Sequence, residues 1–223
     1  MPVTPAWLSA ATGATEIGQL CPNGEEHAPG EAFAINDRAQ VVGETAIGGC
    51  LFAAHHAFLY SGGTLQDLGT LGGGESAARA IDNLGGTIVG YARVKANNCG
   101  SFGEPSCPLH AFSYRNGKMT DLGTLPGADE SKAYGVNDLG LIVGTSGGHA
   151  FLDFMGSMFD LNSLIPANSR WTLTEARGMN DRGEIVGTGL HNGIERGFIL
   201  KPRWLWLLRT GWTRSDRCAE SPQ

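Results

Sequence analysis

Charged and aromatic residues are scarce in this chain of 223 residues, at 17% and 8% of the sequence. No apolar stretch approaches the roughly 20 residues that a membrane-spanning helix needs. The net charge is −6, from 22 acidic and 16 basic residues, whereas a nucleic-acid surface needs a basic stripe over the phosphates. We therefore expect neither a transmembrane segment nor a nucleic-acid partner.

The phosphate-binding loop and the zinc-protease motif are also lacking. The glycine-rich run at 72–76 lacks the Gly-Lys-Ser/Thr of a phosphate-binding loop, and no His-Glu-x-x-His occurs. We expect no catalytic residue, no cofactor and no metal site, and the sequence leans away from an enzyme without excluding one. The 20 N-terminal residues lack the basic and apolar regions of a signal peptide.

Glycine, in contrast, is abundant, with 34 residues, which favours many short strands joined by tight turns over helices. Four similar segments recur, each with small residues two apart, an apolar residue, a polar turn with Asn or Asp, β-branched residues and a closing glycine. They span residues 31–43, 75–90, 130–144 and 175–187. Each segment predicts two strands joined by a tight turn.

Two further motifs complete each repeat. His-Ala-Phe occurs at 56–58, 110–112 and 149–151, with Arg-Gly-Phe at 196–198. Asp-Leu-Gly-Thr-Leu occurs at 67–71 and 121–125, with variants at 160–164 and 16–20. In the second repeat the pattern predicts strands near 78–82, 87–93, 110–114 and 119–125.

Four strands in roughly 40–50 residues is the size of a propeller blade. The chain begins with a lone fourth-strand motif (16–20) and ends with a repeat of three strands (175–200). We therefore expect an all-β fold, a propeller of four blades with four antiparallel strands each, closed by mixing N- and C-terminal strands in one sheet. The alternatives are a fragment of a larger ring and an open array completed by a partner chain. A closed ring predicts a monomer, with an extension at 1–13, the propeller domain at 14–200 and a basic, poorly ordered tail at 201–223.

Small residues alternate along the first strand of each repeat, for example Ala78 and Ala80. We expect each small pair to share one crowded face near the axis, with the following apolar residue, such as Ile81, facing the neighbouring sheet.

Together these motifs resemble the HAF-type extracellular repeat of bacterial proteins, over about residues 16–200. The resemblance implies a secreted or surface-exposed bacterial protein of poorly defined activity, and it brings no established catalytic residues. Family members often end in a Pro-Glu-Pro sorting segment, of which residues 201–209 hold only a faint echo. An extracellular or cell-surface location is expected from the resemblance and from cysteine pairing.

Four cysteines fall in or near loops that a propeller would place on one face. They favour the disulfides Cys21–Cys50 and Cys99–Cys107, with Cys218 left over in the tail. The alternatives are reduced thiols and a zinc site of Cys99, Cys107 and His110. The repeated His56, His110 and His149 favour a structural hydrogen bond at a strand start, as do the repeated Asp67, Asp121 and Asp160.

A ligand site requires residues that break the repeat symmetry. One first-strand position reads Phe33, Arg79, Tyr134 and Arg177. Two guanidiniums beside two aromatic rings suit an acidic, sugar-like or peptide ligand, although snorkelling rim residues would give the same pattern.

Three functional hypotheses remain from the sequence. The first is a non-catalytic extracellular module that binds a glycan or protein ligand through its loop face. The second is a carbohydrate-active hydrolase or lyase at the channel mouth, with Arg79, Tyr134 and Arg177 as positioning residues. The third is a structural repeat fragment without activity of its own.

Overall fold

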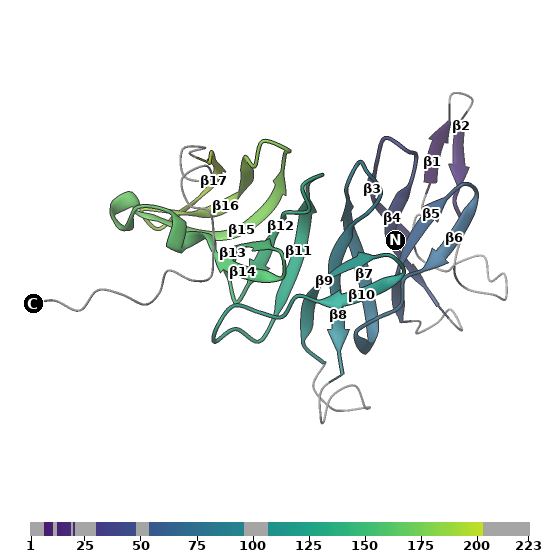
Figure 1. Cartoon of the computed structure of the whole chain (residues 1–223), viewed down its shortest axis with the longest axis horizontal. Helices are drawn as coiled ribbons and strands as arrows, with labels where there is room; N and C mark the ends of the chain where they lie inside the picture. The colour runs from purple at the N-terminus through teal and green to yellow at the C-terminus, as the bar shows by residue number, and fades with distance from the viewer. Residues whose placement is uncertain are drawn as a thin grey trace, which may run out of the picture.

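The computed structural model describes residues 7–10, 13–18, 20, 30–47, 54–95 and 107–202, and these residues form antiparallel sheets joined by turns (Figure 1). The expected all-β class is confirmed. The only helices of the described residues are the short 3₁₀ turns η1 (Leu161–Leu164) and η2 (Ala167–Ser169), and neither has the length and apolar character to cross a bilayer.

Four sheets follow one another along the chain, each a simple meander. The first contains β3 (Gly30–Ile35), β4 (Val41–Ala46), β5 (His55–Ser61) and β6 (Thr64–Asp67). The second contains β7 (Gly72–Ile81), β8 (Ile88–Val94), β9 (Leu109–Arg115) and β10 (Lys118–Asp121). The third contains β11 (Ser131–Val136), β12 (Ile142–Ser146), β13 (His149–Phe154) and β14 (Ser157–Asp160), and the fourth contains β15 (Trp171–Met179), β16 (Ile185–His191) and β17 (Ile194–Leu200).

The two strands that precede the first sheet correct the expected closure of the ring. β2 (Gly13–Glu16) pairs with β1 (Trp7–Ala10), and β17 pairs with β16. The predicted strand at 16–20 therefore does not complete the fourth sheet, and Figure 1 shows β17 and the β1–β2 hairpin at opposite ends of the molecule. The motif at 16–20 corresponds to the turn that follows a fourth strand and not to the strand itself: in the first sheet Asp67 ends β6 and accepts a hydrogen bond from the Gly69 N–H at 2.7 Å.

The expected domain limits stay predictions. β1 precedes the expected domain start at residue 14, and most of the expected tail, residues 203–223, lies outside the described residues.

Neighbouring sheets pack face to face through the same residue positions. The second interface of the chain shows the pattern: Val89 and Ala111 of the second sheet meet Ala133, Ile142 and Phe151 of the third. The leucine of each linking motif fills the same interface; Leu68, Leu122 and Leu161 occupy this position in turn. Ile17 packs in the same way on Val41 and Phe58 of the first sheet.

The first strand of every sheet carries a β-bulge, which corrects the expected side-chain pattern. In the second sheet the register shifts between Ala78 and Ala80, because Arg79 is inserted between them. One extra residue reverses the faces of all residues that follow it. Ala78 and Ile81 therefore face the first sheet, whereas Ala80 faces the third.

Candidate functional site

The bulges bring the predicted ligand residues to equivalent places in the structure. A register shift at an equivalent position flanks one residue in each first strand, between Ala32 and Ala34, Ala78 and Ala80, Ala133 and Gly135, and Ala176 and Gly178. β7 and β15 each have one further shift nearer the start of the strand. The four inserted residues, here called the bulge row, are Phe33, Arg79, Tyr134 and Arg177. Since first strands of successive sheets contact one another, the bulge row runs across all four sheets.

Within the bulge row the side chains contact each other in two pairs. The Arg79 guanidinium carbon lies 3.8 Å from the centroid of the Phe33 ring. The Arg177 guanidinium carbon lies 5.7 Å from the centroid of the Tyr134 ring, and the Arg177 Nε also forms an ion pair with Glu175. Stacking on a ring leaves the in-plane N–H groups of a guanidinium available for a carboxylate.

Two residues that sequence reasoning missed extend this surface: Tyr91 in the second strand β8, and Lys132 in the first strand β11. Lys132 Nζ lies 5.3 Å from the centroid of the Tyr91 ring, and Tyr91 also interacts with Arg79. For Tyr91 a signal was present in the sequence: the residue that follows the glycine of each second strand differs between repeats, as Glu44, Tyr91, Thr145 and Thr188.

Partial burial sets the protonation of the groups around the bulge row. Burial raises the pKa of the Tyr91 phenol, and it likewise raises the pKa of Tyr134. Burial also raises the pKa of Glu44, against the opposing effect of His55, whose Nδ1 lies 3.8 Å from Glu44 Oε1. Both phenols are therefore neutral donors at physiological pH, rather than bases.

A hollow of about 270 Å³ lies between the first and second sheets and includes Tyr91 in its wall. Its lining is mostly polar and acidic, from Glu44, His55, Glu75, Ser76, Tyr91 and Leu109. Because Tyr91 contacts Arg79, the hollow and the bulge row are neighbouring parts of one surface.

The repeated histidines make the expected hydrogen bond, and the partner is the repeated aspartate. His56 Nδ1 lies 2.9 Å from Asp67 and His110 Nδ1 lies 2.9 Å from Asp121. In the third sheet His149 Nδ1 lies 2.7 Å from Asp160. Each pair joins the start of a third strand to the end of the fourth, which is a structural arrangement repeated once in each of the first three sheets.

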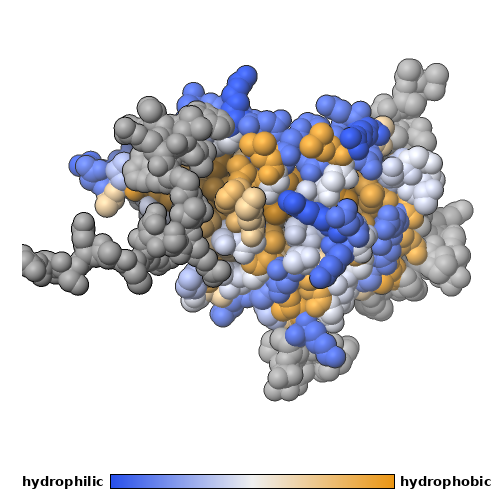
Figure 2. Space-filling model, in the orientation of Figure 1, coloured by the Kyte–Doolittle hydropathy of each residue, from blue (hydrophilic) through white to orange (hydrophobic). Residues whose placement is uncertain are grey.

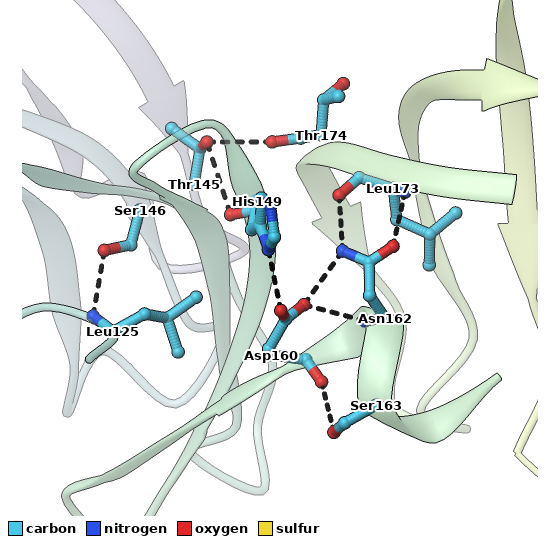
Figure 3. Close-up of polar contacts among 9 residues, drawn as sticks. All are labelled: Leu125, Thr145, Ser146, His149, Asp160, Asn162, Ser163, Leu173 and Thr174. Atoms are coloured by element: carbon cyan, nitrogen blue, oxygen red, sulfur yellow. Dashed lines mark hydrogen bonds and ion pairs between the residues drawn. The ribbon is translucent and has the colours of Figure 1, made fainter. Parts of the chain in front are cut away.

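Figure 3 shows how the third of these pairs is linked to the next sheet. Asp160 accepts from Asn162, whose side chain donates to the carbonyl of Leu173 and accepts from its N–H. Burial acts to raise the pKa of Asp160, but the hydrogen bonds from His149 and Asn162 outweigh it and lower that pKa. The carboxylate is thus held charged as an anchor for the linker.

Residues 144–148 read Gly-Thr-Ser-Gly-Gly, which fits the Gly-x-Ser-x-Gly pattern of hydrolase nucleophiles. The structural context differs, because Ser146 ends a strand and enters a turn before another strand. Ser146 is 1% exposed, and its Oγ accepts from the Leu125 N–H at 3.0 Å (Figure 3). The same Oγ donates to Glu130 O. Ser146 therefore has a structural role.

Cys21, Cys50 and Cys99 lie outside the described residues, so both disulfides stay predictions. Cys107 is described and buried. In the part of the chain that the structure describes, no cluster of three His, Cys, Asp or Glu side chains is arranged to hold a metal ion.

Comparisons with protein-family models, with curated proteins and with solved structures find no match to this chain.

Proposed function

We propose that the chain is a non-catalytic binding module of the HAF-repeat type, acting outside the bacterial cytoplasm, and that it holds an acidic glycan along the bulge row. Its four sheets act as propeller-type blades that carry this row. The observation that supports the proposal is that one bulge recurs in every sheet, yet the residue it presents is different in kind: a ring, a guanidinium, a ring and a guanidinium. A purely structural bulge has no need for this alternation.

The chemistry of the row suits a carboxylated sugar chain. Guanidinium groups bind carboxylates through paired hydrogen bonds, and aromatic rings stack on the apolar faces of sugar rings. Arg79 and Arg177 supply the first interaction, and Tyr134 supplies the second. Tyr91 and the neighbouring hollow add a neutral hydroxyl donor on the same surface.

An acidic peptide is the alternative ligand with the same charge. A hydrolase or lyase at this surface is the second-ranked proposal, because the phenols of Tyr91 and Tyr134 have raised pKa values, opposite to what a general base at neutral pH requires. A structural fragment without a ligand ranks third.

Titration calorimetry with an oligogalacturonate tests the binding proposal. We expect the double variant Arg79→Gln/Arg177→Gln to weaken binding at least about tenfold, equivalent to about 1.4 kcal/mol. The matched control is Arg38→Gln/Arg182→Gln, which removes the same charge from two exposed hairpin turns and should change binding less than about twofold.

Equal losses in the two double variants would show that binding follows net charge alone and would contradict the bulge-row site. Neutral and acidic glycans and an acidic peptide complete the panel, and failure of the wild-type chain to bind any of them refutes the proposal. Release of shortened or unsaturated products would favour the enzyme hypothesis instead.

A further inference from the structure

Every sheet has two faces, and each face has a fixed set of positions. One face, here called the end face, packs on the next sheet in the chain. It contains the valine that precedes the glycine of the second strand, and the two residues on either side of the phenylalanine of the third strand. In the first sheet these residues are Val42, Ala57 and Leu59. The other face, here called the start face, packs on the preceding sheet. It contains the first small residue and the apolar residue of the first strand, together with the phenylalanine of the third strand. In the second sheet these residues are Ala78, Ile81 and Phe112. Three interfaces in the chain join an end face to the next start face.

Within the described ranges, no residue covers the end face of the fourth sheet in this way. Val42, Val89 and Val143 are all 0% exposed, whereas the equivalent Val186 is 46% exposed. Ile199, which faces Val186 across the β16–β17 pair, is 55% exposed. An apolar surface that is buried three times elsewhere in the same chain is therefore left open to solvent.

The start face of the first sheet is covered over its second and third strands but not over its first strand. Val41 and Phe58 are buried beneath Ile17, just as linker leucines cover the equivalent residues elsewhere. On the first-strand side, however, Ala32 is exposed while the equivalent Ala78, Ala133 and Ala176 are fully buried. Ile35 is 57% exposed.

The β1–β2 hairpin explains why only half of this start face is covered. The Trp7–Glu16 pairing repeats the register of the Phe58–Asp67 pairing in β5 and β6, and Ile17 then packs as Leu68 does. The hairpin thus stands in the place of the third and fourth strands of a preceding sheet. The fourth sheet shows the opposite composition: it has the first three strands, and among the described residues only β16 is hydrogen-bonded to β17.

We propose that the open end face is a docking surface for the first sheet of a second copy of this chain. β15, β16 and β17 of one copy take the place of a preceding sheet, and β17 replaces β1 beside β2 of the other copy. The contact repeats an interface that the chain already forms three times, so its apolar residues match in kind and position. The contact joins two different surfaces, so it is heterologous and produces a ring of chains or an open row.

Light scattering coupled to gel filtration tests this association over a range of concentrations. We expect the wild-type chain to exceed the mass of one copy, increasingly with concentration. The end-face variant Val186→Asp/Ile199→Asp and the start-face variant Ala32→Asp/Ile35→Asp should each weaken association at least about tenfold, because burying an unpaired carboxylate is costly. Circular dichroism checks that each variant keeps its strands, and Leu139→Asp/Met155→Asp, at exposed turn residues, is the matched control.

Mixing the two face variants gives the decisive result. Each variant retains one intact face, so an equimolar mixture should form a 1:1 dimer that grows no further. Removal of residues 1–10, which contain β1, should strengthen association of the wild-type chain by freeing the edge of β2. A wild-type chain that stays monomeric at all concentrations would overturn the proposal and assign the end face to residues of its own chain. Association that only the end-face variant abolishes would also contradict it, because that result indicates a symmetric contact between two end faces.

Discussion

Arg79 of the second sheet lies over Phe33 of the first, with 3.8 Å between the guanidinium carbon and the ring centroid. Both residues are the inserted residue of a bulge in a first strand. The contact therefore joins equivalent positions of two successive repeats, and its two partners have complementary chemistry. The coupling free energy between these two side chains can be measured.

A double-mutant cycle with Phe33→Leu and Arg79→Gln should give a coupling free energy of about 0.5–1 kcal/mol, the range of partly exposed cation–π pairs. Denaturant unfolding of the four proteins supplies the measurement. Pairing Phe33→Leu with Arg38→Gln, at an exposed turn, should give no coupling. A zero value for the first cycle would mean that the stacked geometry contributes nothing to stability.

Gly90→Ala should prevent proper pairing of β7 and β8. A Cβ at this position would overlap the carbonyl oxygen of Ala77, and backbone has no room to yield, so we expect a loss of about 3 kcal/mol or more in the free energy of unfolding. Gly74→Ala is the matched control, because a Cβ there meets no atom within 4 Å. Equal melting temperatures for the two variants would contradict the close approach of the strands.

Ser131→Ala should loosen the contact between the second and third sheets. Ser131 Oγ accepts from the Ala111 N–H at 2.8 Å and donates to Gly123 O, and its loss leaves the buried Ala111 N–H unsatisfied and removes the donor to Gly123 O. We expect a cost of about 1–3 kcal/mol in denaturant unfolding. The exposed Ser157→Ala should stay within about 0.5 kcal/mol of the wild type, and a similar result for Ser131→Ala would refute the bridging role.

Asp153 predicts a pH dependence of stability. Burial raises the pKa of this carboxyl, which is 2% exposed and whose Oδ2 has no hydrogen-bond partner. A raised pKa in the folded state favours the protonated form, so the stabilising contribution is complete below the unfolded value of about 3.9 and is lost as pH rises through the folded value.

Asp153→Asn should therefore remove this loss between acidic and neutral pH, as followed by thermal unfolding at a series of pH values. Asp129→Asn, which removes a carboxyl from an exposed residue, is the matched control. Parallel profiles for wild type and Asp153→Asn would show that Asp153 does not titrate abnormally.

The sequence was sufficient for the local pattern. The turn residues and β-branched pairs placed β8 and β9 nearly to their ends, and the repeated His-Ala-Phe correctly indicated a hydrogen bond at the third strand of the first three sheets. These features are local, since they depend on residues that are close in the chain or equivalent in each repeat.

The bulges and the open ends were not predictable in the same way. Ala78 and Ala80 read as a regular alternation, and only pairing with Gly90 and Val89 shows that Arg79 is an insertion. The linker around Ile17 was predicted as a strand because the Asp-Leu-Gly-Thr-Leu motif was included in the predicted fourth strand. In the structure the fourth strands end at the first residue of this motif, as β6 does at Asp67. Ring closure depends on the accumulated angle between sheets, which no single repeat encodes.

The bulge also has a consequence for how such a protein changes over time. The main chain alone decides where the inserted side chain points, while the neighbouring small residues carry the packing. A substitution at Phe33 or Tyr134 can therefore alter what the surface recognises and leave the sheets untouched, so that new specificities are open to selection one repeat at a time.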